Sequence, residues 1–142
     1  MRNMKYLDAN VFIYLALSEG SESKAIAAKN IIEKVVEGSF VSATSSLTWD
    51  ELVWVVKKFE GKEVAKEEGR KFISLPKLKI LSVGESTLYA AQDLVAAYGL
   101  KPRDAIHAAC CIENGIEEII SDDSDFDGID GLKRTKLEEA LK

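Results

Sequence analysis

The chain has a single histidine, His107, and its two cysteines, Cys110 and Cys111, are neighbours in the run HAACCIE. Adjacent cysteines on a helix cannot easily form a disulfide with each other, and no Cys-x-x-Cys pair is present to hold zinc. One histidine also leaves little material for a His/Cys metal site or a Ser-His-Asp triad. We therefore expect Cys110 and Cys111 to be small buried residues, and the chemistry to depend on other side chains.

Long apolar runs are also missing. No stretch approaches the length of a membrane helix, and the N-terminus lacks the pattern of a signal peptide. Proline is scarce, and no glycine- or serine-rich run suggests a linker. The 142 residues are enough for one compact domain with a full hydrophobic core. We expect a single domain over residues 1–142, located in the cytoplasm.

The sequence has no surplus of positive charge, since 24 acidic residues outnumber 19 basic ones and give a net charge of −5. Proteins that bind phosphate backbones usually carry a basic surface, so the charge argues against direct binding of nucleic acid. An acidic protein can still bind a phosphodiester when divalent cations lie between its carboxylates and the phosphate.

What is present is an alternation of short apolar runs with amphipathic segments. The order predicts a mainly parallel central sheet between helices on both faces, a three-layer α/β/α fold. We expect strands over residues 5–7, 39–43, 78–81 and 117–121, and helices over residues 11–17, 21–38, 45–59, 62–75, 85–98, 101–115 and 136–142, with Gly38 and Gly99 ending two of them.

Aspartates follow two of the predicted strands. Asp8 ends the first strand, and Asp122, Asp123 and Asp125 follow the fourth, in the run SDDSDFDGID. In parallel α/β folds the site lies beyond the carboxyl ends of the strands. Carboxylates that are distant in sequence are therefore predicted to meet at one edge of the sheet.

The letters D-S-D-F-D-G from Asp123 also match the start of a calcium-binding EF-hand loop. Such a loop needs a bidentate glutamate at position twelve and a helix on each side. Position twelve is Arg134, and the preceding EEIIS is short and β-branched. Calcium binding in this manner is therefore excluded.

Each candidate acid also has an ordinary structural explanation. Asp8 or Asn10 can cap the helix that follows. Glu51 fits a capping box with Thr48 as the cap. Asp104, in the first turn of a helix after Pro102, is favoured there by the helix dipole.

Several other polar residues have open interpretations. His107 lies three residues after Asp104 and can hydrogen-bond it, although a partly buried helix residue is its simpler role. Asp127 and Asp130 are typical turn residues. The spacing of Lys62, Lys66 and Arg70 is typical of a solvated helix face and also suits a surface that meets a polyanion.

Taken together, four segments in this order resemble the PIN-domain ribonucleases, and most closely the VapC-type toxins of prokaryotic toxin–antitoxin pairs. The segments are YLDANVFIY, SSLTWDELVW, LKPRDAIHAA and IISDDSDFDGI, and the resemblance covers nearly the whole chain. The fourth segment resembles a Ser/Thr-x-Asp-x-x-Phe pattern through Ser121, Asp123 and Phe126. Asp122 and Asp125 flank Asp123, and either can share its role.

The resemblance implies a Mg²⁺- or Mn²⁺-dependent ribonuclease that cuts RNA internally, with a homodimeric state and a small antitoxin partner. It implies four catalytic and metal-binding acids: Asp8, Glu51, Asp104 and Asp123. It also gives supporting roles to Asn10, Ser121, Asp122 and Asp125. Crowded carboxylates need a cation, because their mutual repulsion otherwise raises their pKa values.

Two rival functions remain open at this point. One is a PIN-like module that binds RNA or protein without cutting, against which the presence of all four acids argues. The other is a phosphotransfer receiver domain, which needs a phosphoacceptor aspartate at the end of a central strand. Neither SFVSA nor LKIL offers one.

Overall fold

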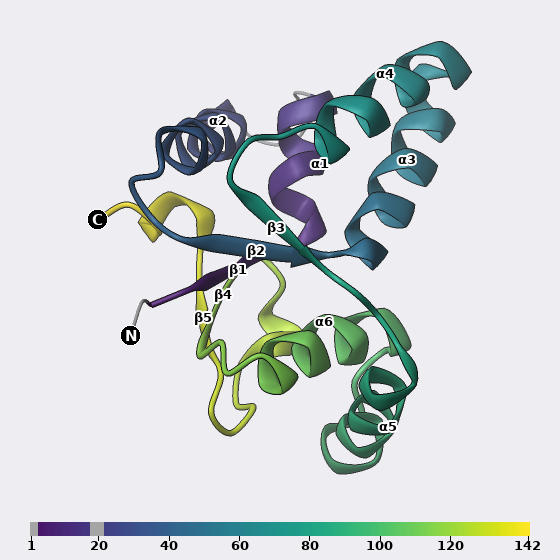
Figure 1. Cartoon of the computed structure of the whole chain (residues 1–142), viewed down its shortest axis with the longest axis vertical. Helices are drawn as coiled ribbons and strands as arrows, with labels where there is room; N and C mark the ends of the chain where they lie inside the picture. Colours follow the sequence, from purple (N-terminus) through teal and green to yellow (C-terminus); the bar gives the residue numbers. More distant parts are fainter. Residues whose placement is uncertain (1–2, 18–21) are drawn as a thin grey trace.

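The computed structural model describes residues 3–17 and 22–142 and contains a five-stranded sheet in which every neighbouring pair of strands is parallel (Figure 1). The strand order is β3-β2-β1-β4-β5. The strands are β1 (Lys5–Leu7), β2 (Ser42–Ser45), β3 (Leu78–Leu81), β4 (Glu118–Ile120) and β5 (Lys133–Thr135).

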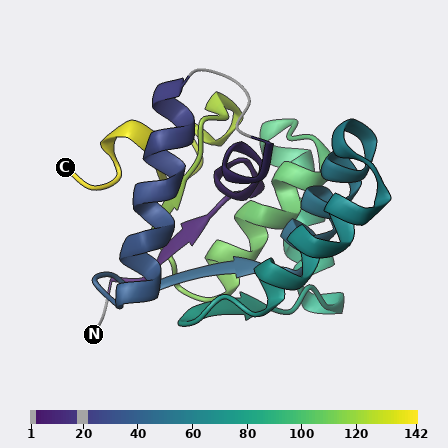
Figure 2. The same ribbon diagram turned by 90° about the horizontal axis from the view of Figure 1, so that it is seen from above.

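Helices cover both faces of this sheet. In Figure 1 and in the view turned by 90° (Figure 2), α1 to α4 lie on one side and α5 and α6 on the other. The helices are α1 (Ala9–Leu17), α2 (Glu22–Glu37), α3 (Ser46–Glu60), α4 (Lys62–Ile73), α5 (Glu85–Tyr98) and α6 (Pro102–Glu113), with short 3₁₀ turns η1 (Ser124–Phe126) and η2 (Leu137–Glu139). The predicted three-layer α/β/α fold is confirmed.

Each face of the sheet has its own hydrophobic core, and neighbouring residues of one strand contribute to different cores. Tyr6 packs with α5 and α6, whereas Leu7 packs with α1 to α4. Ile119 and Ile120 divide in the same way. Both faces are buried, which is why these strands are apolar at successive positions and do not alternate with polar residues.

The strand order reverses beside β1. The chain passes from β1 to β2 on one side, and later returns to place β4 on the other side of β1. Ligands of open α/β sheets bind beyond the carboxyl ends of the strands at such a reversal. Asp8 directly follows β1 and Ser121 directly follows β4, so both lie at this point.

Most predicted elements are present, with three corrections. β2 runs over Ser42–Ser45, so it begins three residues later and ends two residues later than predicted. The fifth strand, β5, was not predicted, because its three residues Lys-Arg-Thr are polar and lie at the edge of the sheet. The predicted final helix over residues 136–142 is wrong, since only the 3₁₀ turn η2 forms there.

The predicted helix ends at Gly38 and Gly99 are confirmed, and both glycines have positive φ. Residues 1–2 of the predicted domain, and Ser21 at the start of the predicted second helix, lie outside the described residues. Among the residues that are described, no helix has the length and apolar character that crossing a membrane requires.

Candidate functional site

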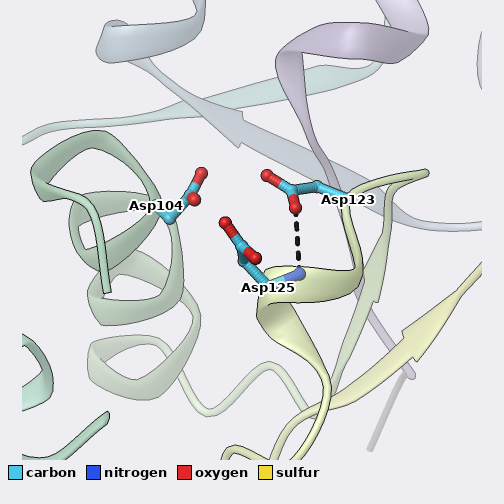
Figure 3. A group of neighbouring side chains, drawn as sticks. All are labelled: Asp104, Asp123 and Asp125. Atoms are coloured by element: carbon cyan, nitrogen blue, oxygen red, sulfur yellow. Dashed lines mark hydrogen bonds between the residues drawn. The ribbon is translucent and has the colours of Figure 1, made fainter. Parts of the chain in front are cut away.

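Three aspartates gather at the carboxyl edge of the sheet (Figure 3). Asp104, Asp123 and Asp125 each offer a carboxylate oxygen, and these oxygens all lie within 4.8 Å of one another. Asp104 comes from α6, whereas Asp123 and Asp125 come from the turn after β4. Carboxylates from two separate elements therefore meet here, but the acid that joins Asp123 and Asp125 in this group is Asp104 and not Asp8, for which the meeting was predicted.

Local structure fixes these side chains. Pro102 begins α6, which places Asp104 in its first turn. Asp123 precedes η1, and its Oδ1 accepts a hydrogen bond of 2.9 Å from the backbone N–H of Asp125. The buried ring of Phe126 anchors the same turn in the core. The two carboxylates of the turn are therefore held facing α6.

The electrostatics of the cluster are those of crowded anions. Burial raises the pKa of Asp104 to about 7, and the negative charges of Asp123, Asp8 and Asp125 act in the same direction. Its Oδ2 atom is buried and has no hydrogen-bond partner among the described residues. A carboxylate oxygen buried beside two further carboxylates suits a hard divalent cation, which prefers oxygen ligands.

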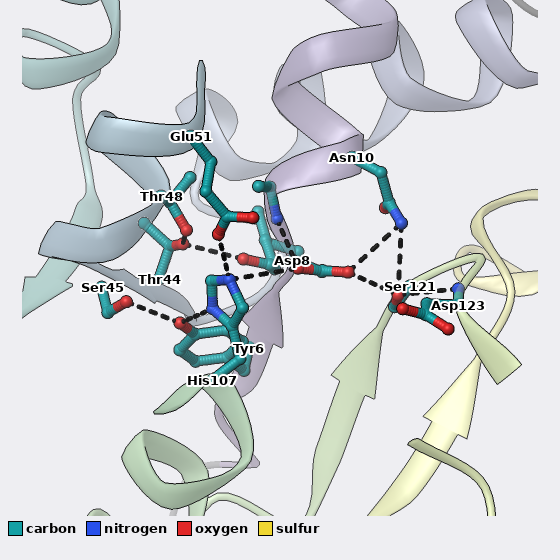
Figure 4. Close-up of polar contacts among 12 residues, drawn as sticks. Tyr6, Asp8, Asn10, Thr44, Ser45, Thr48, Glu51, His107, Ser121 and Asp123 are labelled. Carbon is teal, nitrogen blue, oxygen red and sulfur yellow. Dashed lines mark hydrogen bonds and ion pairs between the residues drawn. The ribbon is translucent and has the colours of Figure 1, made fainter. Parts of the chain in front are cut away.

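Asp8 lies next to this cluster and is tightly hydrogen-bonded (Figure 4). Its Oδ1 accepts the backbone N–H of Ala9 at 2.7 Å, and its Oδ2 accepts the hydroxyl of Ser121 at 2.6 Å. Asn10 donates its amide group to both Asp8 Oδ2 and Ser121 Oγ, at 3.2 Å each. Ser121 Oγ also accepts the backbone N–H of Asp123 at 2.9 Å, which connects Asp8 to the aspartate turn.

Burial raises the pKa of Asp8, although the nearby His107 and the hydrogen bonds from Ser121 and Ala9 act against this increase. Only 7% of Asp8 is exposed. The carboxyl group is thus pre-positioned rather than free to rotate, with Asn10 and Ser121 in contact with it.

Glu51 is held by His107. Nε2 of the imidazole donates to Oε1 of Glu51 at 2.5 Å and lies 3.5 Å from Oδ1 of Asp8. The capping-box prediction for Glu51 is wrong: the residue before α3 is Ser45, it makes no side-chain capping bond, and Thr48 instead bonds Thr44 at 2.7 Å. Glu51 is therefore available to the site.

His107 is almost fully buried, with 1% of its surface exposed. Burial by itself lowers its pKa, but the hydrogen bond to Glu51 and the charges of Asp8, Glu51 and Asp104 outweigh this and raise it. The hydrogen bond from His107 to Asp104 that the sequence allows is not formed, since the ring nitrogens of His107 bond Tyr6 and Glu51 instead.

One residue beside the site, Tyr6, was missed from the sequence. The hydroxyl of Tyr6 lies 2.6 Å from Nδ1 of His107 and 2.8 Å from Oγ of Ser45. In the sequence Tyr6 is simply one apolar residue of a buried strand. Only the pairing of β1 with β2, together with the position of α6, brings its hydroxyl to the histidine.

The structure also separates the neighbouring acids of the last segment. Asp122 forms an ion pair of 2.7 Å with Lys24, whose ammonium group lies 5.5 Å from the centre of the Tyr14 ring. Asp127 pairs with Arg134 at 2.8 Å. The residue at position twelve of the supposed EF-hand thus binds an aspartate of the same loop, which agrees with the exclusion of that motif.

The carboxylate oxygens of the four predicted acids do not all lie within 4.8 Å of one another, and their shared role as ligands stays a prediction. Of the residues in the described ranges, the group that can share an ion contains Asp104, Asp123 and Asp125, without Asp8 and Glu51. Asp8 and Glu51 form an adjacent pair, joined through His107. The residues fit a divalent cation, and Asp125, predicted only as a possible supporting residue, is part of the group.

The sequence also matches a family model. The PIN domain model aligns with residues 5–132. This range includes every element from β1 to η1 and ends directly before β5. The chain belongs to the PIN-domain family.

Several solved structures resemble this PIN domain, and three of them are from bacteria. One is a toxin–antitoxin complex from Klebsiella pneumoniae, at 26% identity and a TM-score of 0.64, covering 91% of this chain and 95% of that chain. Another is VapBC2 from Rickettsia felis bound to a promoter DNA fragment, at 20% identity and a TM-score of 0.71, covering 94% and 98%.

A third is VapC20 from Mycobacterium tuberculosis, described as a toxin that cleaves the sarcin–ricin loop, at 16% identity and a TM-score of 0.70, covering 86% and 92%. At these identities the second and third similarities show the fold alone. No curated protein sequence matches the chain significantly.

Proposed function

We propose that this PIN domain is a Mg²⁺- or Mn²⁺-dependent endoribonuclease and acts as the toxin of a type II toxin–antitoxin pair. The observation that carries the proposal is the cluster of Asp104, Asp123 and Asp125, with the buried, unbonded Oδ2 atom of Asp104 at the carboxyl edge of the sheet. Carboxylates this close repel one another when they are ionised, and a divalent cation bound between them would remove that cost.

We assign Asp104, Asp123 and Asp125 as the residues that would hold the ion. Asp8 and Glu51 lie beside them and would bind the ion directly or through water. A divalent ion held by these residues would supply charge to polarise a phosphate, to balance the leaving oxygen and to lower the pKa of a bound water. Mg²⁺ and Mn²⁺ both prefer the carboxylate oxygens present here.

The chain's own residues supply position and acid–base capacity. Ser121 and Asn10 fix the Asp8 carboxylate, so that its orientation does not change as an RNA phosphate arrives. A group with a pKa of about 7, such as Asp104 in the absence of metal, also takes up or releases a proton near neutral pH. The edge at which these groups lie is where substrate must approach.

The partners follow from the relatives and from the surface. The similar structure from Klebsiella pneumoniae is described as a toxin–antitoxin complex, and VapC20 is described as a toxin that cleaves the sarcin–ricin loop. In this chain, large apolar side chains are exposed on several helices, where they offer surface to an antitoxin and to a second copy of the chain. Among them are Trp54 and Phe59 on α3, and Leu88 and Tyr89 on α5.

The test is RNA cleavage by the purified protein. With Mn²⁺ or Mg²⁺ it should cut structured RNA at internal positions, and EDTA or Asp104→Asn should abolish the cutting. Asp93→Asn, a change of an exposed aspartate on α5, is the matched control and should retain activity. Cleavage that persists in EDTA, or in Asp104→Asn, would reject the proposal.

The second candidate is a PIN-like module that binds RNA or protein without cutting it. The exposed apolar residues of α3 and α5 suit such a role as well. That candidate predicts RNA binding that does not depend on metal and no cleavage under any metal condition.

A further inference from the structure

The one histidine of the chain lies at the junction of four elements. His107, on α6, contacts Tyr6 of β1 through Nδ1 and Glu51 of α3 through Nε2. Tyr6 in turn contacts Ser45 at the end of β2. Figure 4 shows this row of polar groups lying behind the Asp8 carboxylate, on the side away from Asn10.

We infer that His107 is a positioning residue, whose Nε2 holds the Glu51 carboxylate and lies 3.5 Å from the Asp8 carboxylate, so that both keep the orientation in which they bind the divalent ion directly or through water. The inference rests on the proposed function, because it assigns a task within the same site. His107 itself is not expected to touch RNA or the ion, since it is buried behind the two carboxylates.

The geometry gives His107 this task for three reasons. Glu51 is only partly buried, and its side chain has three rotatable bonds, so it needs a partner to stay in one conformation. The 2.5 Å bond from Nε2 supplies that partner. The imidazole cannot rotate away, because the Tyr6 hydroxyl holds its other nitrogen in the core. Residues that orient metal ligands in this way typically change metal affinity or activity by about 10–100-fold when they are replaced.

A buried histidine with satisfied hydrogen bonds can also serve stability alone. The two roles differ in what they predict for the folded protein. A purely structural His107 affects the free energy of unfolding and leaves the Mn²⁺ affinity of the remaining folded protein unchanged. A positioning His107 affects that affinity directly, and an amide that donates from the place of Nε2 should restore part of it.

The experiment measures Mn²⁺ dissociation constants by the loss of the free-ion EPR signal, together with unfolding curves. His107→Ala should weaken Mn²⁺ binding by about 10–100-fold. His107→Gln should recover part of the loss, because its amide N–H can reach Glu51. Leu94→Ala is the control, a buried residue of α5 outside the site, and should lower stability without changing the Mn²⁺ affinity.

A second measurement uses the wild-type protein and needs no variant to fold. Because the chain has a single histidine, its imidazole NMR signals belong to His107 without ambiguity. Saturating Mg²⁺ should shift these signals, since the ion changes the carboxylates to which the ring is bonded. Glu51→Gln should shift them in the metal-free protein as well, whereas Asp93→Asn should not.

The outcomes separate this inference from the proposed function. In one outcome the wild type binds Mn²⁺ and cuts RNA, but Mg²⁺ does not shift the imidazole signals and folded His107→Ala binds Mn²⁺ as tightly as the wild type. The positioning role is then wrong, whereas the proposed nuclease function is supported. If the wild type neither binds Mn²⁺ nor cuts RNA, the proposed function fails and the positioning role fails with it.

Discussion

In the metal-free protein, Asp104→Asn should stabilise the fold at pH 8. The pKa of this carboxyl group is raised from 3.8 to about 7 in the folded protein, so the folded state binds the proton more tightly than the unfolded chain. Its contribution to stability is therefore fully present below pH 3.8 and is lost as the pH rises through 7. Asparagine keeps the shape of the group and never acquires the charge.

The expected size follows from the shift. A pKa moved from 3.8 to about 7 corresponds to about 4 kcal/mol in free energy. Water screens this partly exposed group, which reduces the expected effect to about 1–2 kcal/mol. Denaturant unfolding in EDTA should show Asp104→Asn more stable than the wild type by that amount at pH 8, with the difference disappearing near pH 4.

Saturating Mg²⁺ should reverse the difference in stability between Asp104→Asn and the wild type. An ion that binds the folded state stabilises it, and the gain increases with the ratio of the ion concentration to its dissociation constant. The wild type should gain more than the variant, because the variant lacks one of the carboxylates that bind the ion. Asp93→Asn, on the exposed face of α5, serves as the control and should show neither effect. A variant less stable than the wild type at pH 8 in EDTA would refute the electrostatic reasoning.

Three further predictions concern the surroundings of the site. Asp123→Asn should abolish RNA cleavage, whereas Asp122→Asn should retain most of it, because Asp122 is paired with Lys24 and lies outside the carboxylate group. An equal loss of cleavage in both variants would contradict the assignment of different roles to these two acids. Gly69→Ala should destabilise the protein by about 1 kcal/mol in thermal unfolding, because the new Cβ would lie 2.9 Å from Val53 Cγ2. Overpacking costs about 1–3 kcal/mol, which exceeds the gain of about 1 kcal/mol in helix propensity, so unchanged or higher stability would contradict this prediction. Phe126→Ala, which empties a fully buried position under the aspartate turn, should cost about 3–5 kcal/mol in denaturant unfolding, and a loss below 1 kcal/mol would show that the turn is not anchored there.

The sequence was sufficient for the layers of the fold and for the edge at which the acids meet. Both follow from local signals: apolar runs of strand length, helices ended by Gly38 and Gly99, and the general rule for the carboxyl ends of parallel strands. β5 escaped prediction because an edge strand of three polar residues has no local hydrophobic pattern, and it forms only by pairing with β4.

The grouping of the acids was beyond sequence reasoning. Asp122, Asp123 and Asp125 are residues of the same type, so the sequence does not distinguish them. Their different partners depend on the side of the turn to which each side chain points. Lys24, nearly a hundred residues away, binds the first of them, and α6 faces the other two. The connection from Tyr6 through His107 to Glu51 likewise exists only because three distant elements pack together.

The most direct test of the account is the position of Mn²⁺ in crystals of the protein, located by anomalous diffraction. The account predicts a peak between the carboxylates of Asp104 and Asp123, with oxygens at about 2.0–2.2 Å, and its loss in Asp104→Asn. Density for Mn²⁺ at another place, or none at this cluster in crystals of protein that cleaves RNA, would contradict it.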